Sequence, residues 1–255
     1  MSEIEFLSPA NSVSMADEWF EFASADHFWM RWRHRVLLQQ LRRVRCQISN
    51  ALEIGCGHGV VRQMIERDLG IPVDGCDLNQ RALEKATKGD GRLFLYDIFD
   101  QNAEMLNAYD MILLMDVIEH IKDDVGFLSA SLRHLRGDGI VVLNVPAHMF
   151  FYSKYDEVAG HKRRYNTASV AALFRAANVE PISILQWGFS LVPLLLARRV
   201  VLSFVSRQRT IRTGFTPPNK LARRGLDALQ AIETHIPFAM PLGTSVLAIG
   251  RATSR

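Results

Sequence analysis

The stretch ALEIGCGHGV, residues 51–60, places three glycines at alternate positions directly after a short apolar run. An apolar strand that ends in a glycine-rich turn before a helix is typical of a nucleotide-binding βα unit. The dinucleotide pattern G-x-G-x-x-G requires a glycine at position 60, where this chain has Val60. Glu53 lies beside the turn, where its carboxylate would repel a pyrophosphate and would suit a cationic group on the ligand. Both features argue against NAD.

Strand and helix patterns alternate on both sides of this turn. The predicted strands are residues 51–54, 71–77, 92–97, 109–116, 139–146, 180–187 and 244–251. The predicted helices are residues 60–69, 79–88, 123–136 and 167–178. Strands that alternate with helices of this length indicate βαβ units and a mostly parallel sheet. We therefore predict an α/β, Rossmann-like, doubly wound fold with seven strands.

The chain divides into a core and two additions. Residues 47–187 together with 244–255 carry the alternating pattern and form the predicted core. Residues 1–46 form a predicted N-terminal helical cap, in which the segment 14–17 can begin a helix that continues through an aromatic and basic stretch. Residues 188–243 are far longer than an ordinary connection, so we predict a helical insertion there, between the last two strands.

Composition limits the class of protein. The 255 residues carry a net charge of +3 and only three cysteines, none of them in a C-x-x-C pattern. This cysteine usage favours a reducing compartment over disulfides or a thiolate zinc site, so a cytoplasmic location is expected. The first 20 residues lack a basic segment followed by an apolar one, and no signal peptide is expected. The apolar run 187–197 is shorter than the roughly 20 residues that span a bilayer.

Acidic residues follow the first strands at the edge where such sheets bind their ligands. Asp77 closes the second predicted strand, where a carboxylate can accept hydrogen bonds from both hydroxyls of a ribose. Asp97 closes the third, where it can accept from an adenine amino group while Ile98 covers a face of the ring. With Glu53, these residues suit a ligand that has ammonium and sulfonium groups and no phosphate.

The E-x-G-x-G-x-G pattern at 53–59, the two further acids and the segment DMILLMDVIEH (110–120) together resemble a class I S-adenosylmethionine-dependent methyltransferase. The resemblance is firm over residues 50–147. It implies a Rossmann-like sheet with an antiparallel last strand, and S-adenosyl-L-methionine as the cofactor. The residues that we assign to cofactor binding are Trp29, Arg33, Glu53, Gly55, Gly57, Gly59, Asp77, Leu78, Asp97, Ile98, Met115 and Asp116.

Three further segments resemble a bacterial group within this family that is often associated with sugars, lipids and secondary metabolites. HFWMRWRHRVL (27–37) resembles the aromatic and basic segment that closes over the cofactor. PFAMPLGTSVLAIGR (237–251) resembles the final strand, and YDEVAGHKRRYN (155–166) resembles a G-H-x-R-R-Y segment. The resemblance therefore favours methyl transfer to oxygen on a small-molecule or lipid-linked acceptor.

The segment that follows the fifth predicted strand carries the candidate catalytic residues His161, Arg164 and Tyr165. A hydroxyl acceptor must lose its proton, and His161 is the candidate base because an imidazole titrates near neutral pH. Arg163 and Arg164 could hold an anionic group of the acceptor. The pocket could be lined by Tyr152, Tyr155 and Tyr165. The alternative is that Asp156, His161 and the arginines form a structural ion-pair network.

Asp116, Glu119 and His120 form a D-x-x-E-H pattern. It resembles the E-x-x-E-H site of magnesium-dependent catechol-type O-methyltransferases, in which a metal lowers the pKa of the acceptor hydroxyl. The sequence VIEH also occurs in metal-free members, and we assign no metal. A metal-dependent O-methyltransferase, an NAD-dependent oxidoreductase and a non-catalytic cofactor-binding protein remain the alternatives.

The predicted insertion is basic as well as apolar. Between residues 188 and 226 there is no acid, and the basic residues are Arg198, Arg199, Arg207, Arg209, Arg212, Lys220, Arg223 and Arg224. Apolar and basic faces together suit an element that touches a membrane surface, at the inner membrane face in this case. A lid over the core or a homodimer contact is the alternative. Binding of nucleic acid is not expected, because no aromatic and basic pattern of a known nucleic-acid-binding module appears and the net charge is modest.

Overall fold

The computed structural model describes residues 3–9, 24–44, 46–206, 209–210, 213, 220–235 and 240–253. The predicted helix start at residues 14–17 lies outside these ranges. The described helices are α2 (Phe28–Leu41), α3 (Val60–Leu69), α4 (Gln80–Glu84), α5 (Asp124–Leu132), α6 (Lys154–Ala159), α7 (Thr167–Ala176), α8 (Val192–Ser203) and α10 (Lys220–His235). Short 3-10 helices are η1 (Ile98–Asp100), η2 (Ile118–His120), η3 (Met149–Phe151) and η4 (Phe189–Leu191).

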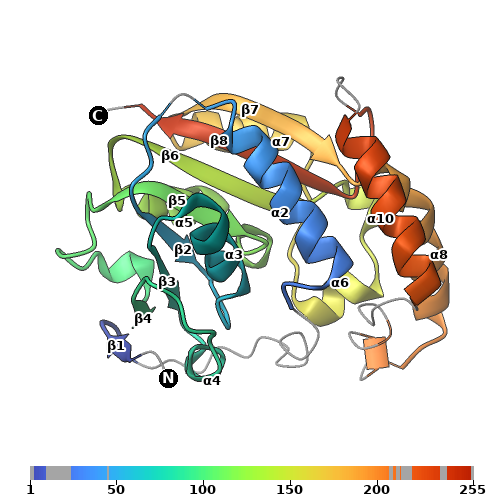
Figure 1. Cartoon of the computed structure of the whole chain (residues 1–255), viewed down its shortest axis with the longest axis horizontal. Coiled ribbons are helices and arrows are strands. Elements are labelled where there is room, and N and C mark those ends of the chain that lie inside the picture. The colour runs from blue at the N-terminus through green and yellow to red at the C-terminus, as the bar shows by residue number, and fades with distance from the viewer. Residues whose placement is uncertain are drawn as a thin grey trace.

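A single mixed sheet forms the centre of the described molecule (Figure 1). Its strands are β1 (Ile4–Phe6), β2 (Ala51–Ile54), β3 (Val73–Asp77), β4 (Leu93–Leu95), β5 (Tyr109–Met115), β6 (Leu135–Pro146), β7 (Val179–Trp187) and β8 (Ser245–Ala252). Their order is β1-β4-β3-β2-β5-β6-β8-β7. The first six strands run parallel, whereas β8 is antiparallel to both β6 and β7. The predicted α/β, doubly wound architecture with an antiparallel last strand is confirmed.

The described sheet has eight strands, one more than the seven that the sequence predicts. All seven predicted strands are present, and β1 adds an eighth at the edge of the sheet, within the segment that was assigned to the helical cap. It pairs with β4 over three residues only, from Ile4 opposite Leu93 to Phe6 opposite Leu95. Three residues are too few to show an alternating pattern in the sequence. At the opposite edge, β7 carries Pro181 beside a shift in register.

Apolar side chains of the central strands point to both faces of the sheet, as expected of buried parallel strands. Met111 and Leu113 of β5 pack on one face with residues of α2 and α3. Ile112 and Leu114 of the same strand pack on the other face with residues of α5 and α7. The core therefore consists of two layers that sandwich the sheet, and the carboxyl ends of β2, β3, β4 and β5 share one edge.

Helix bounds follow the local stop signals. Helix α3 has the predicted bounds, because Gly59 and Gly70 adopt left-handed conformations at its two ends. Helix α5 is shorter than predicted, since β6 already begins at Leu135. Helix α4 spans only Gln80–Glu84. The segment 148–166, predicted only as a polar stretch, contains η3 and α6.

The described residues between β7 and β8, in the segment that the sequence assigns to an insertion, include η4 and the helices α8 and α10. Helix α8 contacts η3 and α6, which follow β6, whereas α10 contacts α2 and η4. Glu233 of α10 accepts backbone hydrogen bonds from Gly188, Phe189 and Ser190 at distances of 2.6 to 3.0 Å. This carboxylate fixes the start of η4 to α10. Among the described residues, no helix is long and apolar enough to cross a membrane.

Candidate active site

The glycine turn after β2 depends on backbone conformations that favour glycine. Gly55, Gly57 and Gly59 have φ angles of 74°, 54° and 77°. A Cβ atom at Gly55 would lie 2.5 Å from Cγ2 of Val117. The backbone N–H of Gly57 donates to the Asp77 carboxylate at 2.7 Å. The turn is thus fixed by its own glycines and by the acid that closes β3.

Two acidic residues lie beside the turn, the buried Glu53 and the half-buried Asp77. Glu53 is 2% exposed and accepts a hydrogen bond from the backbone N–H of Arg62 at 3.0 Å. Burial raises the pKa of Glu53 to about 8. Asp77 accepts from the backbone N–H groups of Gly57 and Asn79, and burial raises its pKa as well. For Glu53, burial outweighs the nearby charges of Arg33 and Arg62, so a cationic group of a ligand would further favour its ionised form.

The other residues predicted from strand ends lie at the same edge. Asp97 accepts a hydrogen bond from the backbone N–H of Phe99 at 3.0 Å and caps η1. The hydrogen bond uses Oδ1 of the carboxylate, and Oδ2 takes no part in it. Ile98 and Met115 are buried, and Leu78 is half-buried. These placements are compatible with an adenine site, whose contacts stay a prediction.

Helix α2 brings Arg33 to the end of β5. The guanidinium of Arg33 forms an ion pair with Asp116 and lies 4.6 Å from the ring centroid of Trp29. Asp116 has a left-handed backbone with φ 62° and accepts a second hydrogen bond from Asn144 at 2.8 Å. Asn144 in turn accepts from the indole N–H of Trp187 at 3.0 Å. The cap segment and the core thus meet at residues assigned to cofactor binding.

His161, Asp156 and Arg164 form a buried network in the segment after β6. Nδ1 of His161 lies 2.8 Å from the Asp156 carboxylate. Arg164 donates to both oxygens of the same carboxylate, at 2.7 and 3.1 Å. Hydrogen bonds from His161 and the charge of Arg164 outweigh burial and hold the pKa of Asp156 well below its usual range. The guanidinium of Arg164 is therefore occupied by this network, which was the structural alternative considered from the sequence.

The remaining polar residues of this segment also have partners within the chain. Arg163 pairs with Asp124 at 2.7 Å, and the hydroxyl of Tyr165 donates to the same carboxylate at 2.9 Å. Tyr152 donates to the backbone carbonyl of His161 at 2.9 Å. These contacts hold the segment in place. Binding of an acceptor anion by Arg163 or Arg164 stays a prediction.

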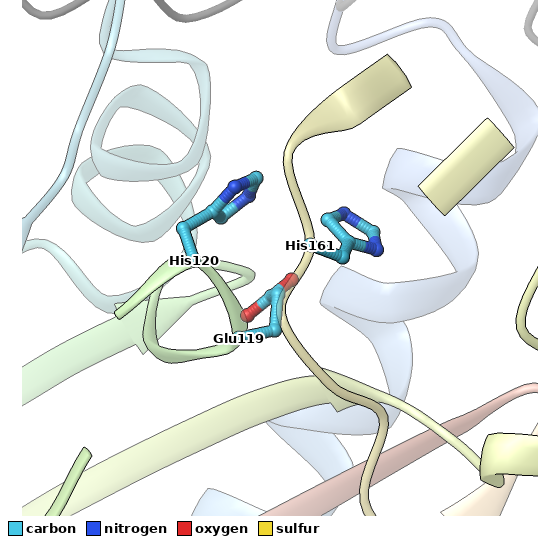
Figure 2. Close-up of side chains that lie close together, drawn as sticks. All are labelled: Glu119, His120 and His161. Atoms are coloured by element: carbon cyan, nitrogen blue, oxygen red, sulfur yellow. The ribbon is translucent and has the colours of Figure 1, made fainter. Parts of the chain in front are cut away.

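A second cluster surrounds His161 on the side away from Asp156. Potential ligand atoms of Glu119, His120 and His161 all lie within 4.8 Å of one another (Figure 2). Burial raises the pKa of Glu119 well above its usual value and lowers the pKa of His120 to about 4. Asp116, part of the alternative metal set considered from the sequence, is not in this cluster because Arg33 and Asn144 hold it. His161 takes its place.

Two residues of the site were missing from the predicted set. Asn144 connects Asp116 to Trp187, and its signal in the sequence is a single amide within the apolar run of β6. Asp156 orients His161, whereas the sequence analysis considers it only as part of a structural ion-pair network. Both act through partners that lie at least five residues away.

A comparison with protein families assigns the class. A family model described as a methyltransferase domain matches residues 18–184, more than half of the chain. The chain belongs to this methyltransferase family, and the class I S-adenosylmethionine-dependent methyltransferase predicted from the sequence is confirmed at the level of the family.

Individual relatives match parts of the chain. A protein of Mycolicibacterium smegmatis described as a probable S-adenosylmethionine-dependent methyltransferase is 29% identical over 161 residues, which are 61% of this chain and 60% of the relative. The ubiquinone biosynthesis O-methyltransferase of Schizosaccharomyces pombe is 28% identical over 100 residues, 36% of each chain. The match thus spans about three fifths of the length of the mycobacterial relative.

A solved structure has the same fold. The S-adenosylmethionine-dependent methyltransferase from Archaeoglobus fulgidus aligns with a TM-score of 0.52 at 15% identity, covering 88% of this chain and 97% of the other. At this identity the likeness supports the architecture of the sheet and not the reaction.

Proposed function

We propose that this chain transfers the methyl group of S-adenosylmethionine to an oxygen atom of an acceptor. The observation that supports the cofactor is the glycine turn, with the buried Glu53 and the half-buried Asp77 beside it, in a chain of the methyltransferase family. The two acids beside the turn suit an ammonium group and a ribose, and they do not suit a pyrophosphate. The short match to ubiquinone biosynthesis O-methyltransferases supports oxygen as the acceptor atom.

The reaction is an in-line displacement. A lone pair of the acceptor oxygen forms a bond to the methyl carbon, the carbon–sulfur bond breaks, and its electron pair stays on sulfur. The products are S-adenosylhomocysteine, a methyl ether and a proton. Because the cofactor is already activated, alignment of the reacting atoms is the main task of the protein and can supply about 7–11 kcal/mol.

We place the acceptor oxygen beside His161, the proposed base. Asp116 links the two halves of the site, since it is held by Arg33 and feels the charge of His161. With Nδ1 of His161 directed at Asp156, Nε2 remains to receive the acceptor proton. We expect His161→Ala to slow methyl transfer by about 10²- to 10⁴-fold, the usual contribution of a positioned base.

Cofactor binding is tested by calorimetric titration of the purified chain with S-adenosylhomocysteine, with NAD as the control. Micromolar binding of S-adenosylhomocysteine and none of NAD is the expected result. Preference for NAD would overturn the proposed function, because the glycine turn would then hold a pyrophosphate. A chain that binds S-adenosylhomocysteine and methylates no acceptor in a panel of phenols, sugars and lipids would be a binding protein.

A lipid-linked acceptor is supported by the outer surface of the insertion. Helix α8 directs apolar side chains outward, and Phe204 is 87% exposed. The exposed apolar residues of α8 and the position that follows it are Leu194, Leu196, Val200, Val201 and Phe204. Exposed arginines accompany them at positions 199, 209 and 224. Apolar side chains flanked by cations suit the headgroup region of an anionic bilayer. Arg198, on the inner side of α8, stacks 4.3 Å from the ring of Tyr155, so the same helix borders the segment that carries His161.

Vesicle flotation checks this surface. We expect the chain to float with vesicles that contain phosphatidylglycerol, and less so as salt is raised, because exposed charges are screened. Replacing Val200 and Phe204 together by glutamate should abolish flotation. Ile182→Glu, at an exposed apolar position on β7, is the matched control and should leave it unchanged. Equal flotation of all three proteins would count against a membrane role for α8, and a dimer in solution lost in the double variant would assign the surface to a second copy.

A further inference from the structure

Figure 2 shows that three side chains from two separate segments converge at His161, the proposed base. Glu119 and His120 belong to η2, after β5, and His161 lies on the loop between α6 and α7. One potential ligand atom of each lies within 4.8 Å of the others. The backbone holds the two segments together, because the N–H of Lys162 donates to the carbonyl of Glu119 at 2.7 Å.

The buried side chain of Glu119 is the feature that indicates a bound cation. Its residue is 0% exposed, and among the described residues neither oxygen has a hydrogen-bond partner. A buried carboxylate without a partner is costly and uncommon in folded proteins. The two imidazoles beside it can supply the remaining ligands that a cation would need.

Each histidine already has the outer partner that is typical of a metal ligand. Metal-binding histidines use one ring nitrogen for the metal and hydrogen-bond a carboxylate or backbone carbonyl through the other. His161 directs Nδ1 at the Asp156 carboxylate at 2.8 Å, which leaves Nε2. The ring of His120 hydrogen-bonds the Gly160 backbone, which leaves its other nitrogen. Arg164 fixes Asp156 in turn.

We propose that Glu119, His120 and His161 bind one divalent first-row transition-metal cation of the Zn²⁺, Mn²⁺ or Co²⁺ kind. Two imidazoles with one carboxylate suit these ions, whereas Mg²⁺ prefers an all-oxygen set. The set differs from a two-carboxylate site, because Asp116 is held by Arg33 and Asn144.

The inference rests on the proposed function and refines the role of His161. Three protein ligands leave open positions on such an ion, and an acceptor hydroxyl bound there would ionise more readily. His161 would then act as a metal ligand, and the cation, in place of a base, would promote loss of the hydroxyl proton. The acceptor would be a hydroxyl compound able to bind a metal, such as a phenol or a catechol.

The test uses the full chain, stripped of metal with EDTA, dialysed and titrated with Co²⁺ while its visible absorption is followed. We expect one Co²⁺ per chain. Glu119→Gln and His120→Asn should weaken Co²⁺ binding by more than the 10- to 100-fold that is typical of losing an outer partner. Glu104→Gln, at an exposed position outside the cluster, is the control and should keep the Co²⁺ affinity of the unmodified chain. Thermal unfolding of each variant establishes that it is folded.

Titration of the same proteins with S-adenosylhomocysteine separates this inference from the proposed function. If the unmodified chain binds S-adenosylhomocysteine but no Co²⁺, or if the Glu119 and His120 variants bind Co²⁺ unchanged, the metal site is wrong and His161 keeps the role of base. If Co²⁺ binds and depends on Glu119 and His120 while S-adenosylhomocysteine does not bind, the metal site stands and the proposed function fails.

Discussion

Replacing Asp156 by alanine is expected to destabilise the protein by about 3–5 kcal/mol, the usual result of removing one partner of a buried ion pair. Arg164 is only 7% exposed and donates two hydrogen bonds to this carboxylate. Without Asp156 its guanidinium would remain buried beside a single backbone acceptor, the carbonyl of Ala147. His161 would also lose the partner that orients its ring.

Urea unfolding followed by circular dichroism measures this loss. The ion pair of Glu5 with Arg92 lies on the surface, so Glu5→Ala is the matched control and should cost less than about 1 kcal/mol. Because the pKa of Asp156 is lowered in the fold, its contribution is complete above the ordinary pKa of aspartate and is lost as the pH falls below it. A cost for Asp156→Ala no larger than that of the control would contradict the network described above.

Binding of S-adenosylhomocysteine is expected to strengthen about tenfold per pH unit between pH 6 and 7.5. Burial raises the pKa of Glu53 to about 8, so the carboxyl group of the free protein is mostly protonated in this range. The ammonium group of the ligand favours the ionised form, and binding therefore releases a proton. The same shift makes the free protein less stable as the pH rises from about 4.5 to about 8, because the unfolded chain loses this proton first.

Calorimetry at several pH values, in buffers with different enthalpies of ionisation, measures both the affinity and the released proton. Glu53→Gln keeps the shape of the side chain and removes its titration, so the affinity of this variant should be flat over the same range. A flat profile in the unmodified chain would show that Glu53 does not face the ammonium group.

Much of the fold could be predicted because its signals are local. Buried parallel strands are short apolar runs, and the bounds of α3 are set by Gly59 and Gly70 at its ends. Strand β1 could not be found in this way, since it pairs with the edge strand through only three residues. The early end of α5 depends on pairing of Leu135 with Tyr109, which no pattern within the helix reveals.

The same distinction between local and long-range signals applies to the site. The acids at strand ends could be placed from the sequence, because the carboxyl ends of parallel strands share one edge. The pairing of Arg33 with Asp116 joins residues 83 positions apart, and the ring of His120 lies 4.8 Å from that of His161. Spacing along the chain could not reveal these contacts, and for this reason the alternative metal set included Asp116 in place of His161.

The two borders of the sheet bear on how this protein can associate. An exposed strand offers unpaired backbone groups that a second chain can use to extend the sheet, and this is a common route to aggregation. Here one border is the three-residue β1, and the other is β7, where Pro181 lacks an N–H group and the register shifts beside it. Strand β1 is too short for a long template, and the nine-residue β7 is interrupted by its proline and the register shift. Extension of the sheet by a second chain is therefore disfavoured at both borders, and association through side chains would depend on shape and charge and not on the backbone.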